Sequence, residues 1–197
     1  PISHPQLSTG KPEDLCEQPL QELYMSLLGA IAYLAHTRVD ILVFVSALQR
    51  HTSKPTVLHV KKLNKLLAWT QKNPKKLAYK KIGNSSTYAE KGYITHLKAI
   101  SDAAYKKETE DGYSLRGAVF VRSVGPLTDN STTQTGLGHL IDYICRSQRH
   151  VTRSTFAAEL LSAGDTADQA ILIAQMLQEL ANGPEEATIA RDKRTRG

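Results

Sequence analysis

The spacing of apolar residues changes once along this chain, and the change predicts two structural units of different kinds. Between residues 20 and 82, apolar residues recur every three or four positions, as on a helix that buries one face. After residues 83–92, a polar stretch bounded by glycines, apolar and β-branched residues recur at the shorter period of a β-strand. We therefore expect a helical segment over 20–82, a linker over 83–92 and a mixed α/β domain over 93–197.

Within residues 20–82, the apolar spacing and the positions of proline predict three helices. Apolar stretches at 23–34 and 39–48, separated by a short polar break, indicate two packed helices. A third helix is expected to begin near Pro55, because proline suits the first turn of a helix, and to end at the pair Asn73-Pro74. Trp69 is assigned to the buried stripe of this third helix.

The residue pattern after position 92 predicts one long helix, with strands before and after it in the sequence. The helix is expected over 155–180 and is ended by the run Asn182-Gly183-Pro184. Three antiparallel strands, a helix and then a parallel strand make a mixed α/β order, in which the helix crosses over the sheet. The expected strands are 93–101, 113–123, 139–144 and 187–191.

Composition excludes several classes of protein. The apolar runs are shorter than the roughly 20 residues that cross a bilayer, and Cys16 and Cys145 form no CxxC pair. We therefore expect an intracellular protein without a membrane segment, a disulfide or a zinc site. Residues 1–19 contain four prolines and no sustained apolar period, so they predict an extended leader.

Positive charge is concentrated in one stretch of the chain. Residues 41–89 contain ten Lys and Arg residues and no Asp or Glu. Such a concentration is expected where a protein neutralises phosphates of a nucleic acid. A solvated lysine-rich face, or one that binds an acidic partner, is the alternative. The lysines predicted to contact nucleic acid are Lys54, Lys61, Lys62, Lys65, Lys72, Lys75 and Lys76.

Three acidic residues stand where a mixed α/β domain brings them toward one edge of the sheet. Asp102 is expected to end the first strand, Glu159 to lie in the first turns of the helix, and Asp192 to follow the fourth strand. Clustered carboxylates repel one another unless divalent cations offset their charge, although acids at strand ends are also common without a metal. Asp165 and Asp168 fall about 240° and 180° around the helix from Glu159, so we expect them to be solvated surface residues.

Short motifs between residues 24 and 192 have the order and spacing of a known family. They begin at Tyr24 (YMSLLGAIAYLA), Thr37 (TRVDI), Pro55 (PTVLH), Ser101 (SDAAY), Gly112 (GYS), Ile141 (IDY), Ser147 (SQR) and Ser154 (STFAAE). Together they resemble copia-type LTR retrotransposon Pol polyproteins, in the part where the thumb or connection of the reverse transcriptase precedes an RNase H domain. The resemblance covers most of the chain.

The resemblance implies an RNase H-like fold, here truncated at its C-terminus. Such a domain hydrolyses the RNA strand of an RNA/DNA hybrid during reverse transcription by a two-metal mechanism. Asp102, Glu159 and Asp192 would be the catalytic residues and would hold two Mg²⁺ ions, with Mn²⁺ as a substitute; no organic cofactor is implied.

The resemblance also implies partners and a location. The partners would be an RNA/DNA hybrid or template-primer duplex and the rest of the polyprotein, in a cytoplasmic virus-like particle or in the nucleus. A catalytically inactive RNase H-like module, which binds nucleic acid or acts as a scaffold in a degenerate or domesticated element, is the alternative function.

The sequence departs from the family pattern at several positions. Ala104 and Ala157 stand where the family has acids, and Lys193 follows Asp192 in place of Asn or Ser. The fourth active-site acid is expected beyond Gly197. We therefore expect cleavage activity from the intact polyprotein rather than from this segment alone.

Overall fold

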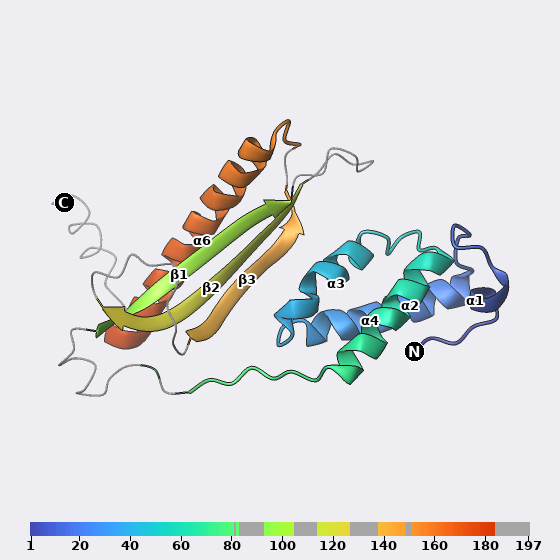
Figure 1. The fold of residues 1–197 in the computed structure, drawn as a ribbon, viewed down its shortest axis with the longest axis horizontal. Helices are drawn as coiled ribbons and strands as arrows, with labels where there is room; N and C mark the ends of the chain where they lie inside the picture. The colour runs from blue at the N-terminus through green and yellow to red at the C-terminus, as the bar shows by residue number, and fades with distance from the viewer. Residues whose placement is uncertain (81, 83–92, 105–113, 127–137, 149–150, 184–197) are drawn as a thin grey trace. The chain divides into compact units, whose positions relative to one another are not determined.

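The computed structural model describes residues 1–80, 82, 93–104, 114–126, 138–148 and 151–183 (Figure 1). The chain divides into two compact units, Pro1–Tyr79 and Lys80–Gly197. The division falls shortly before the predicted linker at 83–92, and that linker lies outside the described residues.

The first unit is helical. Its α-helices α2 and α4 and the shorter α3 correspond to the three helices that the apolar spacing predicts. The described elements are α1 (Gln6–Thr9), α2 (Gln18–Leu34), the 3-10 turn η1 (Val39–Ile41), α3 (Leu42–Gln49) and α4 (Val57–Lys72). A proline in the first turn of α2 fits there because that amide has no partner within the helix.

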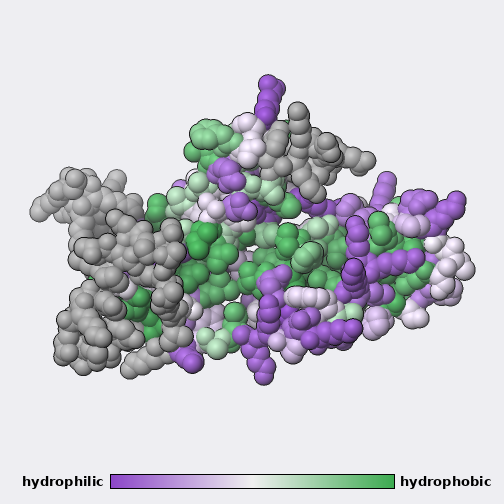
Figure 2. All heavy atoms as spheres, in the orientation of Figure 1, coloured by the Kyte–Doolittle hydropathy of each residue, from purple (hydrophilic) through white to green (hydrophobic). Residues whose placement is uncertain are grey.

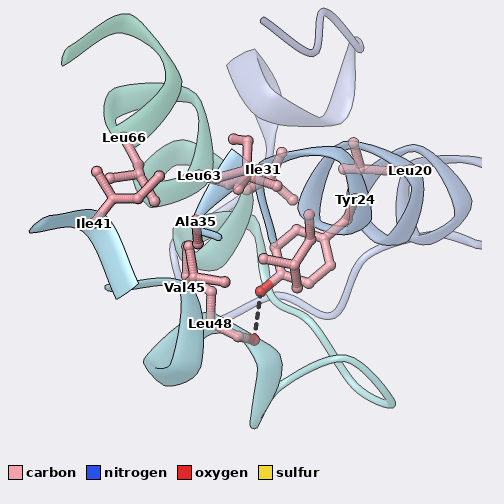
Figure 3. Close-up of a cluster of buried hydrophobic side chains, with 11 residues drawn as sticks. Leu20, Tyr24, Ile31, Ala35, Ile41, Val45, Leu48, Leu63 and Leu66 are labelled. Carbon is pink, nitrogen blue, oxygen red and sulfur yellow. Dashed lines mark hydrogen bonds between the residues drawn. The ribbon is translucent and has the colours of Figure 1, made fainter. Parts of the chain in front are cut away.

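These helices share one apolar core (Figure 3). The hydroxyl of Tyr24 donates a 2.8 Å hydrogen bond to the carbonyl oxygen of Leu48, which joins α2 to α3 inside the core. Burial raises the pKa of Tyr24 to about 12, so the hydroxyl keeps its proton and remains a donor. The other buried members of the core are Leu20, Leu28, Ile31, Ala35, Ile41, Val45, Val60, Leu63 and Leu66.

Helix α4 begins two residues later than the sequence predicts. Pro55 precedes the helix, and Thr56 caps it. The backbone N–H of Thr56 donates to Nδ1 of His59 at 3.0 Å, while the Thr56 side chain bonds the backbone N–H of His59 in return. This reciprocal capping box satisfies amides that a helix start leaves without partners, which moves the boundary to Val57.

Residues 1–19 differ from the extended leader that the sequence predicts, because they contain α1 and pack against α4. Asn64 on α4 makes two hydrogen bonds with the backbone of Ile2, at 2.7 and 2.8 Å. Leu15 forms an isolated β-bridge with Thr56. These contacts join residues far apart in sequence, so no local apolar period reveals them. Within residues 1–19, the side chains of Ile2, Leu7 and Cys16 pack against the core.

The second unit is mixed α/β. Its described elements are β1 (Tyr93–Ala104), β2 (Leu115–Pro126), β3 (Gly138–Ser147) and α6 (Thr155–Asn182). The strands form an antiparallel sheet in the order β1-β2-β3. β1 and β3 extend beyond the predicted strands, and the register of β2 with β3 shifts between Phe120 and Val121. The predicted strand at 187–191 lies outside the described residues.

Helix α6 lies along one face of this sheet (Figure 1). Ile173 of α6 packs with Ala118 and Phe120 of β2. Ser154 caps the start of the helix by accepting a 3.1 Å hydrogen bond from the backbone of Ala157, and Gly183, with φ of 83°, follows its end. Within the described ranges, no helix combines the length and the apolar content that a bilayer crossing requires.

Candidate functional site

Asp102 lies inside β1, two residues before its end, whereas the sequence predicts it at the end of a shorter strand. Its neighbour Ala103 pairs with Arg116 of β2, and both are buried on the face that α6 covers. Successive residues of a strand point to opposite faces. The side chain of Asp102, which is exposed and lies opposite Gly117, is therefore on the face that α6 does not cover.

Helix α6 meets the backbone of β1 at Asp102. The hydroxyl of Ser162 donates a 3.1 Å hydrogen bond to the carbonyl oxygen of Asp102. Glu159 is half-buried and precedes Ser162 by three residues, so it lies on the same side of the helix, one turn away. The structure thus brings together the two segments that carry Asp102 and Glu159, while the Asp102 side chain itself lies on the far face of the strand.

Buried polar contacts hold the start of α6 in place. The backbone N–H of Gln148 donates to the carbonyl oxygen of Ser114 at 2.8 Å, and its side-chain Nε2 donates to the carbonyl oxygen of Ala158 at 2.6 Å. The hydroxyls of Ser114 and Thr152 are 3.0 Å apart. Because Ala158 precedes Glu159 directly, these contacts also position Glu159. The sequence singles out Gln148 only as part of the SQR motif, and its buried position gives that motif a structural role.

The predicted Mg²⁺ site is only partly described. Carboxylate oxygens are the ligands that Mg²⁺ prefers, so Asp102 and Glu159 suit it chemically. Asp192, the third predicted ligand, lies outside the described residues. Among the residues that the structure describes, no three His, Cys, Asp or Glu side chains gather closely enough to hold a metal ion. The two-metal site therefore stays a prediction.

The sequence predicts Asp165 as a solvated surface residue, but its side chain also pairs with the sheet. Its carboxylate forms an ion pair with Nη1 of Arg116, whose side chain is only 4% exposed. Helical spacing places Asp165 away from Glu159, but that spacing says nothing of which strand faces it. Asp168 is exposed, as expected.

Helix α4 carries a face of lysines opposite its buried stripe. Counted from Val60 at about 100° per residue, the buried Leu63 and Thr70 fall on one side of the helix. The exposed Lys61, Lys65 and Lys72 fall within about 40° of one another on the other side, with Lys62 next to them. We call these four lysines the basic face.

Charge and exposure distinguish the predicted contact residues from one another. Helix α4 contains no acidic residue. Within the described residues, the lysines of the basic face form no ion pair. Figure 2 shows hydrophilic residues grouped over the helical unit. Lys54 and Lys76 are exposed as well, but they lie outside α4. Lys75 differs, because its Nζ lies 3.3 Å from Oδ2 of Asp40.

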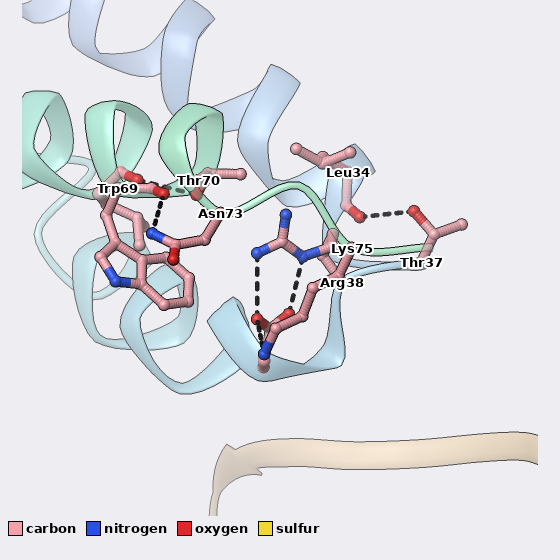
Figure 4. Close-up of polar contacts among 9 residues, drawn as sticks. Leu34, Thr37, Arg38, Trp69, Thr70, Asn73 and Lys75 are labelled. Atoms are coloured by element: carbon pink, nitrogen blue, oxygen red, sulfur yellow. Dashed lines mark hydrogen bonds and ion pairs between the residues drawn. The ribbon is translucent and has the colours of Figure 1, made fainter. Parts of the chain in front are cut away.

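Trp69 is not part of the buried stripe of α4, although its apolar side chain predicts that it would be. It lies about 180° from Val60 around α4 and is 41% exposed, while Thr70 occupies the stripe instead. The guanidinium of Arg38 lies over the indole, 5.7 Å from its centroid (Figure 4). Counting the helical angle, rather than the apolar character alone, would have placed Trp69 among the lysines.

Comparison with known proteins points to transposons. The chain is similar to the retrovirus-related Pol polyproteins from transposons RE1 and RE2 of Arabidopsis thaliana, each 27% identical over 157 residues. The aligned part makes up 80% of this chain and 9% of each polyprotein, so the chain spans about a tenth of the length of these relatives. No protein-family model and no solved structure matches the chain. What the chain resembles, across both of its units, is therefore one part of a retrotransposon Pol polyprotein.

Proposed function

We propose that this chain is part of a retrotransposon Pol polyprotein, in which its second unit is an RNase H-type domain that hydrolyses the RNA strand of an RNA/DNA hybrid. The helical unit would be the thumb or connection that precedes it and would contact the nucleic acid through its lysines. The similarity to two transposon Pol polyproteins supports the context. The observation that carries the nuclease assignment is the hydrogen bond from the Ser162 hydroxyl to the backbone carbonyl oxygen of Asp102, because it joins the helix of Glu159 to the strand of Asp102.

Asp102, Glu159 and Asp192 would hold divalent cations. Mg²⁺ bound there would supply charge for activating water and for stabilising the leaving oxygen in phosphodiester hydrolysis. The contribution of this chain is to place the carboxylates. Gln148 and Ser162 fix the first turns of α6 against β1 and β2, so that the helix acid has a defined position.

A specific observation favours the second candidate function, an inactive nucleic-acid-binding module of the same origin. The strand register places the Asp102 side chain on the face of β1 away from α6. Asp102 and Glu159 could share a metal ion only if their carboxylates, which start from opposite faces of β1, both extended to the same point beside that strand. A module that lacks this arrangement would keep the basic face and lose cleavage.

Metal-dependent cleavage by the intact polyprotein tests the two functions against each other. Cleavage of a labelled RNA/DNA hybrid in Mg²⁺ or Mn²⁺ is expected, and Asp102→Asn and Glu159→Gln should each abolish it while leaving hybrid binding within about twofold. Asp168→Asn, an exposed acid of the same helix, is the matched control and should cleave normally. Binding without cleavage by the unmodified polyprotein would establish the inactive module, and full cleavage by the Asp102 variant would refute the site assignment.

A further inference from the structure

We propose that Trp69 stacks on an unpaired base, so that the basic face of α4 binds single-stranded nucleic acid in preference to duplex. This inference rests on the proposed nucleic-acid contact of the lysines and adds the kind of strand and the residue that selects it.

The position of Trp69 on α4 supports this role. Lys65 precedes it by four residues and Lys72 follows it by three, and both spacings place side chains next to each other on a helix surface. Lys62 lies two turns earlier on the same side. The indole is thus surrounded along the helix by positive charges, and α4 has no acidic residue to compete for them.

The indole is held in place without being buried. Arg38, 4% exposed, lies over the ring and is itself fixed by two hydrogen bonds to Asp40, from Nε at 2.9 Å and from Nη2 at 3.0 Å. Asn73 donates to the backbone carbonyl oxygen of Trp69 at 2.8 Å, which fixes the backbone that carries the ring (Figure 4). Because Nε and Nη2 of Arg38 already donate to Asp40, we assign this guanidinium to orienting the ring rather than to binding phosphate. A ring that is already ordered loses little conformational freedom when a base stacks on it.

An aromatic ring among lysines suits an unpaired strand. Every base has a π-face on which an indole can stack whatever the sequence, and lysines on both sides neutralise the adjoining phosphates. In a duplex these π-faces are occupied by neighbouring base pairs, so only phosphate contacts remain for the same surface. An acidic protein segment would likewise meet the lysines but would offer no base to the indole.

Intrinsic fluorescence tests the stacking directly, because Trp69 is the single tryptophan of the chain. We would titrate the 197-residue protein with a twelve-nucleotide oligo(dT), with an abasic oligonucleotide of the same length, with a duplex of that length and with polyglutamate. Oligo(dT) is expected to quench Trp69 emission strongly, and the other three ligands to change it little. Equal quenching by oligo(dT) and the abasic strand, or by polyglutamate, would overturn the proposal.

Variants separate stacking from charge, with binding followed by anisotropy of labelled oligonucleotides. Trp69→Ala should weaken oligo(dT) binding about tenfold and leave binding of the abasic strand unchanged. The oligo(dT) affinity of Trp69→Phe should fall between that of the wild-type protein and that of Trp69→Ala. Leu58→Ala, which removes a similarly exposed apolar side chain from α4 (40% exposed against 41%), is the matched control and should change neither affinity by more than about twofold. Circular dichroism of each variant checks that the helices persist.

The lysine variants distinguish failure of this inference from failure of the proposed function. The double variant Lys65→Gln, Lys72→Gln should weaken binding of oligo(dT) and of the abasic strand alike. If it weakens neither, the proposed nucleic-acid contact fails and the stacking proposal fails with it. If it weakens both while Trp69→Ala binds oligo(dT) normally, the contact stands and only the stacking inference is refuted.

Discussion

Asp165 of α6 and Arg116 of β2 form an ion pair in which the arginine is 4% exposed and the aspartate 47% exposed. The pair joins helix to sheet beside the apolar contacts of Ile173 with Ala118 and Phe120. A guanidinium that is almost fully buried needs a partner of opposite charge, because desolvating an uncompensated charge is costly.

Asp165→Asn should therefore destabilise the second unit. Because Asp165 is about half exposed and water can compensate in part, we expect a loss of about 1–3 kcal/mol in the free energy of unfolding. Asp168→Asn, three residues along the same helix and exposed, should cost less than about 0.5 kcal/mol. Urea denaturation measures both values, and equal stabilities for the two variants would contradict the role of the ion pair.

Stability of the helical unit should fall as the pH drops below about 6.5, through His59. Burial, and then the nearby His51 and Lys62, lower the pKa of His59. The unfolded chain therefore takes up the His59 proton at a higher pH than the folded chain does. Between the pKa of His59 in the folded state and its higher pKa in the unfolded state, a falling pH thus favours unfolding. Protonation would also remove the Nδ1 acceptor that caps α4 through Thr56.

His59→Gln keeps an acceptor at the capping position but cannot titrate, so its melting temperature should depend less on pH between 5 and 7. The stacked His51, with ring centroids 3.9 Å from His59, is the other titratable ring at this contact. Asp40 does not confound the measurement, because Arg38 holds its pKa below the usual value and its own contribution is lost only at lower pH. An unchanged pH profile in the variant would rule out His59 as the cause.

Lys75 should contribute less to nucleic-acid binding than Lys72, although the sequence predicts both as contacts. Lys75 already pairs with Asp40, whereas Lys72 lies on the basic face. Lys72→Gln should lower the slope of log binding constant against log salt by about 1, and Lys75→Gln by clearly less. Salt titrations with one labelled oligonucleotide give both slopes, and a larger change for Lys75 would mean that the Asp40 pair opens on binding.

Tyr24→Phe should cost the helical unit about 1–2 kcal/mol, because the carbonyl oxygen of Leu48 would lose its buried donor. Leu63→Ala leaves a cavity in the same core and should lower the free energy of unfolding by about 2–5 kcal/mol, which gives a reference value for the smaller effect of Tyr24→Phe. Chemical denaturation of the two variants measures the difference. A Tyr24→Phe variant as stable as the wild-type protein would show that water replaces the lost hydrogen bond.

The sequence was sufficient for features that depend on neighbouring residues. The helical spacing of apolar residues predicts α2 and α4, because a helix that buries one face must repeat apolar residues at its own period. Asn73 after α4 and Gly183 after α6 mark helix ends, since each end is decided within one turn of chain. The position of Glu159 in the first turns of α6 follows from the same local signals.

Only the tertiary structure decided which distant groups meet and which way they face. The packing of Ile2 on Asn64 and the pairing of Arg116 with Asp165 join residues that no local period relates. The face on which Asp102 lies depends on strand register, and a shift of one residue would turn it to the other side of the sheet. Trp69 differs, because the helical angle counted along the sequence is enough to place it among the lysines; only the position of Arg38 over its ring depends on the tertiary structure, since the two residues lie on different elements.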